Sequence, residues 1–249
     1  MKYLIFIFLI FSTRSAFSKN QMSVACEDFI PHTGKKLKNF GWTVDVLRQA
    51  LKEVNYDLKY SFMPWARAVK ITKRGDFDGL YLAYMNDERK KHYYFSDPIG
   101  SVVVSLHGAK SLKFSYNSVK DLRPYKFAVV RKAAHEKEFD QAKYLKKREV
   151  TSYSQGIRML VKGRVDFFVS PEKIFQYNLN LLKEEPVINS LIKSTLPVRK
   201  GKPLKKNNMY LAISKKSKKA LEKLNAFNKG LRIIKKNGKF QKILKDHGF

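Results

Sequence analysis

The chain has 249 residues, a single cysteine, and 51 lysine and arginine residues against 21 aspartate and glutamate residues, which gives a formal net charge of +30. One cysteine excludes an internal disulfide and a Cys/His metal module, so we expect no metal and no cofactor. The charge is unevenly spread, with +4 over residues 19–104, +12 over 105–203 and +12 over 204–249. No zinc-finger, leucine-zipper or RNA-binding signature accompanies it, so we expect a solvated basic surface and no nucleic acid partner.

The chain begins with the features of an export signal. Lys2 precedes a short apolar run, and the small residues Ala16 and Ser18 flank Phe17 in a cleavage-site pattern. We therefore predict a signal peptide over residues 1–18 and a mature, periplasmic chain that starts at Lys19. No later stretch is long and apolar enough to predict a transmembrane helix.

The first half of the mature chain alternates strands and helices. Apolar residues repeat with period two or on one helical face, and this pattern predicts strands at residues 22–31, 57–64 and 77–84 and helices at 42–56 and 65–74. Such a β-α-β-α-β order is typical of parallel strands with right-handed crossovers.

The second half of the mature chain repeats this alternation of strands and helices. Strands are predicted at residues 126–131, 148–153, 165–170 and 208–214, and helices at 133–145, 154–163 and on either side of Gly238. A β-branched run at 100–108 predicts a hinge strand, with residues 202–214 as the return pass. The expected fold class is α/β with two lobes: residues 19–104 plus 204–249 form lobe 1, and residues 105–203 form lobe 2.

Several segments carry a family resemblance in a consistent order and spacing. They are "FGWTVDVLRQAL", "FMPWARAVKITKRGDFDG", "NDERKKHYYFSDPI", "VKDLRPYKFAVV", "SQGIRMLVKGRVDFFV" and "FNKGLRIIKKNGKFQKIL". Over essentially the whole mature chain, the sequence resembles the periplasmic solute-binding proteins of family 3, which serve polar amino acid ABC transporters. The resemblance implies a two-lobed periplasmic-binding-protein-like fold (type II) that closes about a hinge, with the ligand in the cleft.

The resemblance also implies a ligand-binding arginine. The family places an arginine three residues after a threonine, and here the corresponding step runs from Asn86 to Arg89. A guanidinium stays charged and offers a planar set of donors that matches a carboxylate. The aromatic positions of the family's first lobe fall at Phe29 and Trp65, although Trp65 is alternatively a core residue. Arg67 is either a second cation of the cleft or an exposed helix charge.

Other positions depart from the family pattern. Tyr81 and Tyr84 replace small hydroxyl residues ahead of the arginine, and Ala133 stands in the loop that the family uses to bind an anion. The acid that should pair with an α-amino group falls on Pro171, with Glu172 as a neighbouring substitute. The resemblance therefore implies a carboxylate site and leaves the ammonium site open.

The sequence accordingly predicts a periplasmic solute-binding protein of an ABC importer, which captures a small carboxylate-bearing solute, an amino acid or a related organic anion, by hinge closure. We expect a monomer with an inner-membrane permease as its partner, and no enzyme activity, since no catalytic spacing of His or Ser is present. The alternatives are a sensor or adaptor that docks through a basic face, and a dehydratase acting on a small carboxylate.

Overall fold

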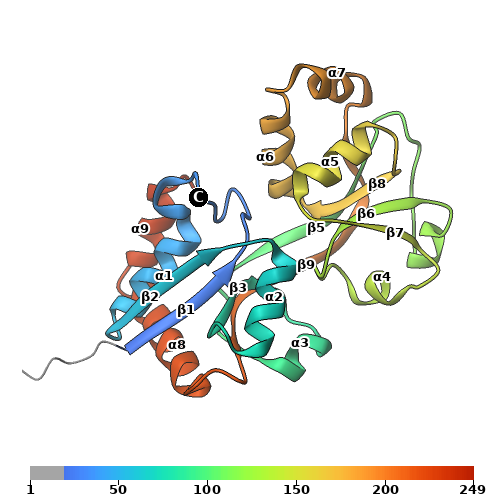
Figure 1. The fold of residues 1–249 in the computed structure, drawn as a ribbon. Helices are drawn as coiled ribbons and strands as arrows, with labels where there is room; N and C mark the ends of the chain where they lie inside the picture. Colours follow the sequence, from blue (N-terminus) through green and yellow to red (C-terminus); the bar gives the residue numbers. More distant parts are fainter. Residues whose placement is uncertain (1–19) are drawn as a thin grey trace, which may run out of the picture.

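The computed structural model describes residues 20–249, which form two lobes joined by two antiparallel strands (Figure 1). The predicted signal peptide lies outside the described residues. The strands are β1 (Asn20–Cys26), β2 (Tyr56–Phe62), β3 (Gly79–Ala83), β4 (Tyr93–Phe95), β5 (Gly100–Gly108), β6 (Lys126–Val130), β7 (Lys146–Val150), β8 (Phe167–Pro171) and β9 (Val198–Ser214). The helices are α1 (Trp42–Lys52), α2 (Trp65–Arg74), α3 (Asp87–His92), α4 (Lys137–Gln141), α5 (Tyr153–Val161), α6 (Glu172–Leu182), α7 (Pro186–Thr195), α8 (Ala220–Lys236) and α9 (Lys239–Asp246), with 3-10 turns η1 (Lys38–Phe40) and η2 (Val119–Leu122).

One hydrogen-bonded sheet runs through both lobes in the order β2-β1-β3-β9-β5-β8-β6-β7, and β4 also pairs with β9. The pairs β1 with β2, β1 with β3, β6 with β7 and β6 with β8 are parallel. Their crossovers run through helices, as the predicted alternation requires. The fold is thus the two-lobed α/β architecture expected from the sequence.

The hinge consists of β5 and β9, which pair antiparallel from Gly100 opposite Met209 to Gly108 opposite Val198. Beyond this contact, β9 continues into lobe 1, where its end pairs with β3 and β4. β5 has the bounds predicted for the hinge strand, whereas β9 begins before the predicted return pass. The lobe boundaries proposed from the sequence lie within these two strands and stay a prediction.

Close packing of α1 against α8 builds the outer layer of lobe 1. α1 buries Val46, Leu47 and Leu51. The facing side of α8 is a buried stripe that includes Gly230. A Cβ atom on Gly230 would lie 1.9 Å from the carbonyl oxygen of Ala50. This close approach requires glycine, because any side chain would force the two helices apart.

Two segments differ from the sequence-based expectation. The predicted helix over 133–145 is wrong at both ends, since α4 covers only Lys137–Gln141. It is preceded by Lys132 in the left-handed region, with φ 61°, and followed by an extended Ala142. Residues 172–195, for which no element was predicted, form α6 and α7.

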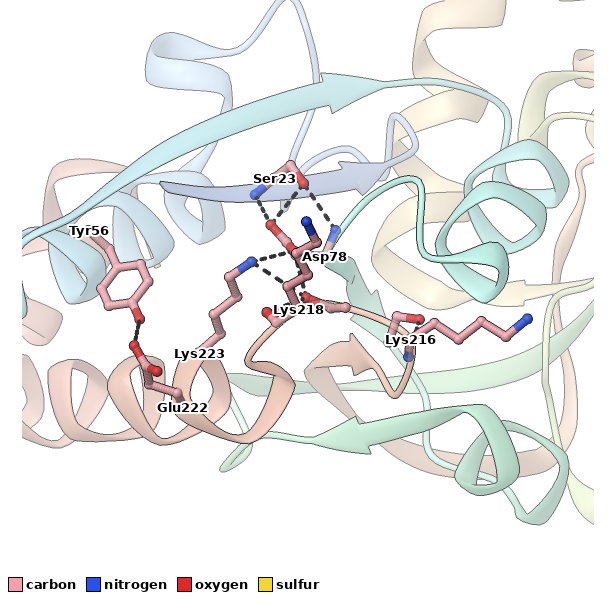
Figure 2. Close-up of polar contacts among 9 residues, drawn as sticks. Ser23, Tyr56, Asp78, Lys216, Lys218, Glu222 and Lys223 are labelled. Carbon is pink, nitrogen blue, oxygen red and sulfur yellow. Dashed lines mark hydrogen bonds and ion pairs between the residues drawn. The ribbon is translucent and has the colours of Figure 1, made fainter. Parts of the chain in front are cut away.

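A network of polar contacts joins β1, β3 and α8 in lobe 1 (Figure 2). The Asp78 carboxylate accepts hydrogen bonds from the backbone N–H of Ser23 at 2.7 Å, the Ser23 hydroxyl at 2.9 Å and the Ser217 hydroxyl at 2.6 Å. Lys223 Nζ lies 2.5 Å from the same carboxylate. Burial alone would raise the pKa of Asp78, but these donors outweigh it and hold the pKa below its usual value. Asp78 is therefore a structural ion-pair residue immediately before β3.

Among residues 20–249, no helix combines the length and the apolar character that crossing a membrane would need.

Candidate functional site

Arg89 is held at the base of the cleft by its place in α3. The side chain of Asn86 caps this helix, and its Oδ1 accepts a hydrogen bond from the Arg89 N–H at 2.8 Å. Capping fixes the backbone of Arg89, and only 6% of the residue is exposed. The first role of Asn86 is thus to position the arginine.

The Arg89 guanidinium contacts both lobes. Nη1 donates to the carbonyl of Tyr84 at 2.8 Å, and Nη2 donates to the carbonyl of Lys132, which belongs to lobe 2, at 3.0 Å. The indole N–H of Trp65 donates to the same carbonyl at 3.0 Å, and the guanidinium lies 5.2 Å from the centre of the Trp65 ring. One backbone carbonyl of lobe 2 therefore accepts hydrogen bonds from two side chains of lobe 1.

The charge of Arg89 is not neutralised by a neighbouring acid. Within the described part of the chain, no carboxylate lies within 4.0 Å of its guanidinium, and burial lowers the pKa of Arg89 below its usual value. A buried cation without a counter-ion is unfavourable because its lost hydration is not replaced. An anion at this position would relieve that cost.

A small cavity lies beside Arg89 between the lobes. Its lining residues are Cys26, Glu27, Phe29, Thr33, Trp65, Tyr81, Leu82, Tyr84, Arg89, Ala133, Ala134 and Tyr153. Its free volume is about 20 Å³, which is room for roughly one or two water molecules. A larger molecule can enter only if the lobes part about the hinge.

Six of the predicted site residues come together at this cavity: Phe29, Trp65, Tyr81, Tyr84, Arg89 and Ala133. Three others lie elsewhere. Asn86 lines a larger neighbouring cavity at the mouth of the cleft, and Arg67 is exposed on α2. Glu172 lines a separate cavity at the hinge, where it accepts hydrogen bonds from Ser105 at 2.8 Å and Arg199 at 3.1 Å.

The cavity contains a carboxyl group that sequence reasoning missed. Glu27 follows β1 in lobe 1 and lines the cavity together with Tyr153 of lobe 2. Removal from water raises the pKa of Glu27 to about 8, and the neighbouring Asp28 adds to the rise while Arg89 opposes it. The cavity therefore carries both a cation and a titratable acid. The sequence places Glu27 inside the strand predicted over residues 22–31, and nothing in that pattern marks it as a site residue.

Aromatic rings form the rest of the wall. Phe29 lies 5.9 Å from Tyr153 of lobe 2 and 6.5 Å from Tyr84, measured between ring centres. The hydroxyl of Tyr84 is buried and has no hydrogen-bond partner, whereas the hydroxyl of Tyr81 donates to the carbonyl of Thr43 at 2.5 Å. The Tyr84 hydroxyl is thus a second polar group that a ligand could satisfy.

No grouping of His, Cys, Asp and Glu side chains suited to a metal ion is found among residues 20–249. What the site offers chemically is recognition: a buried guanidinium, a carboxyl, an unpartnered hydroxyl and flat aromatic surfaces between two lobes that can separate.

Comparison with known families identifies this arrangement. The model of the bacterial extracellular solute-binding proteins, family 3, matches residues 24–248. The chain belongs to this family. No curated protein matches the sequence.

Solved structures of similar fold support the assignment. A mutant of ArgBP from T. maritima is 20% identical, with 92% of this chain and 95% of that chain covered and a TM-score of 0.72. A histidine kinase sensor domain with similarity to periplasmic binding proteins is 18% identical, with coverage of 92% and 96% and a TM-score of 0.74. An ancestral amino acid-binding protein described as a precursor of cyclohexadienyl dehydratase is 22% identical, with coverage of 91% and 95% and a TM-score of 0.69. At these identities the likeness establishes the fold of this family 3 member, and its ligand has to be argued from the site.

Proposed function

We propose that this family 3 protein is the periplasmic binding component of an ABC importer, and that it captures a small carboxylate-bearing solute, an amino acid or a related organic anion, in the cleft. The observation that carries the proposal is the buried Arg89 guanidinium, which faces the cavity without a carboxylate partner. A ligand carboxylate would replace the Lys132 carbonyl as acceptor and would supply the missing negative charge.

Glu27 favours a zwitterionic ligand, one that carries an ammonium group as well as a carboxylate. Its carboxyl lines the same cavity as Arg89 and comes from lobe 1, whereas Glu172, which was suggested for this role, lies at the hinge. A ligand ammonium would favour the ionised form of Glu27 and lower its pKa from about 8. Affinity for an amino acid should therefore rise as the pH rises toward 8.

Closing and opening of the hinge would control the capture and the release of the ligand. Arg89 and Trp65 of lobe 1 meet the Lys132 carbonyl of lobe 2, so a ligand held between these groups would bridge the lobes. Closure around a ligand also excludes water and strengthens the charged contacts. We further propose a monomer that delivers the solute to an inner-membrane permease and acts without catalysis.

The sensor or adaptor alternative shares this cleft, as the similarity to a kinase sensor domain illustrates. A dehydratase would need a titratable group facing the ligand. Glu172 lies outside the cleft cavity, which leaves Glu27 as the group for that role. Product formation from a bound ligand, lost in Glu27→Gln while binding persists, would favour the enzyme.

A thermal-shift panel tests the proposal. The protein is unfolded and refolded to strip carried ligand, then screened against amino acids, dicarboxylates and small organic anions. A hit should be lost in Arg89→Ala, because removing one partner of a buried charged contact costs about 2–5 kcal/mol of binding energy. Arg67→Ala removes the same charge from an exposed position and should leave the shift unchanged. Equal binding by Arg89→Ala and wild type would reject the carboxylate clamp.

A further inference from the structure

A groove on lobe 2, separate from the ligand cleft, lies between α6, α7 and the start of β9. Its apolar lining is Leu179, Ile192, Leu196, Pro197 and Val198, and its volume is about 620 Å³. α7 forms the extremity of lobe 2, on the side away from lobe 1 (Figure 1). The groove is therefore open to a large partner without any need for the hinge to move.

Apolar side chains at this extremity are unusually exposed. The exposed fractions are 50% for Leu196, 39% for Val198 and 73% for Val187, which lies in the first turn of α7. Leu196 ends α7 in the left-handed region, with φ 45°. A leucine is unfavourable there, and glycine or asparagine is the usual residue. Strain that keeps a large apolar side chain in solvent points to a surface that has a partner.

The charged residues that line the groove have one sign. Lys110, Lys183 and Lys193 line it, and no acidic residue is among its lining residues. Each of these lysines is exposed, so its ammonium can extend beyond the apolar surface. The groove thus combines an apolar floor with a cationic rim, which is complementary to an anionic head group attached to an apolar chain.

We propose that this α6–α7 groove docks lobe 2 on the surface of an anionic lipid bilayer. Leu196 and Val198 would enter the boundary between head groups and acyl chains, while the three lysines would contact the anionic head groups. The excess of basic residues in the chain, +30 in total, adds long-range attraction toward the same surface. Docking of this kind would hold the protein near the membrane independently of the solute in its cleft.

Vesicle co-sedimentation of the purified protein tests the proposal at 0.15 M salt, with neutral phosphatidylcholine vesicles and with vesicles that also contain phosphatidylglycerol. Binding to the anionic vesicles should be at least tenfold tighter. Leu196→Asn keeps a residue suited to the left-handed backbone and should weaken binding several-fold. Lys183→Gln with Lys193→Gln should weaken it on the order of tenfold.

Matched controls separate the groove from diffuse charge. Leu221→Asn removes a leucine that is 52% exposed on α8 and should have no effect. Lys236→Gln with Lys245→Gln removes the same charge from exposed positions on α8 and α9 and should weaken binding much less than the groove pair. Equal losses in the groove and control variants, no preference for anionic vesicles, or binding only to vesicles that carry a membrane protein would overturn the assignment to lipid.

Discussion

Lobe 1 contains two clusters of buried charged residues, which differ in whether the charge has an ion-pair partner. Around Asp78, two serines and Lys223 satisfy the carboxylate (Figure 2). In the cleft, the Arg89 guanidinium donates its hydrogen bonds to the backbone carbonyls of Tyr84 and Lys132, and burial raises the pKa of Glu27 to about 8. Paired charge thus holds the lobe together at Asp78, whereas Arg89 keeps a buried charge without an ion-pair partner in the cleft, where we propose that the ligand binds.

The largest expected effect on stability is at Asp78. Asp78→Ala leaves Lys223 without its partner in a largely buried position and should lower the free energy of unfolding by about 3 kcal/mol. Urea denaturation measures the change. Asp76→Ala is the matched control, because Asp76 pairs with Arg74 at an exposed site and should cost less than about 1 kcal/mol. Equal losses of unfolding free energy in Asp78→Ala and Asp76→Ala would show that the buried ion pair contributes no more than the exposed one.

The pH dependence of stability should have opposite signs in the two clusters. Between about pH 4.5 and 8, Glu27 keeps its proton in the folded protein and loses it in the unfolded chain, so raising the pH favours unfolding. Glu27→Gln should remove this decline. Asp78, whose pKa is lowered, stabilises the fold above its usual pKa and loses this contribution on acidification.

Denaturation midpoints of wild type and Glu27→Gln, measured from pH 4 to pH 9, check the sign. Parallel profiles for the two proteins would show that Glu27 titrates normally, and Glu27 would then have no special role in the cleft.

The smallest effect concerns two neighbouring tyrosines. Tyr81→Phe breaks a buried hydrogen bond to the Thr43 carbonyl and should cost about 1 kcal/mol of stability. Tyr84→Phe removes a hydroxyl that has no partner and should change stability by less than about 0.5 kcal/mol. Thermal unfolding of the ligand-free variants compares them. A larger loss at Tyr84 would mean that its hydroxyl is already satisfied without ligand.

Most of the framework was predictable because apolar periodicity reports which face of each element is buried. The hinge strand and the helices around Leu47 and Leu231 follow directly from such patterns. Residues 198–201 at the start of β9 were not predicted, since lysine and glycine have low strand propensity and pairing with β5 orders this segment.

The site was predictable only in part. Arg89, Trp65 and Phe29 were found through the family resemblance, and all three line the cavity. Glu27 could not be recognised, because the cavity that it lines is completed by residues such as Tyr153, which is distant in sequence and lies in the other lobe. Contacts of this kind arise from lobe closure and leave no local pattern in the chain.

We propose that Arg89 is buried in order to bind a ligand and contributes little to the stability of the fold. Thermal unfolding of Arg89→Met, measured with and without the solute found in the thermal-shift panel, tests this most directly. Methionine keeps the apolar length and removes the charge. We predict that ligand-free Arg89→Met is at least as stable as wild type, and that the solute no longer raises its melting temperature. A ligand-free loss as large as that of Asp78→Ala, together with continued protection by the solute, would contradict the account.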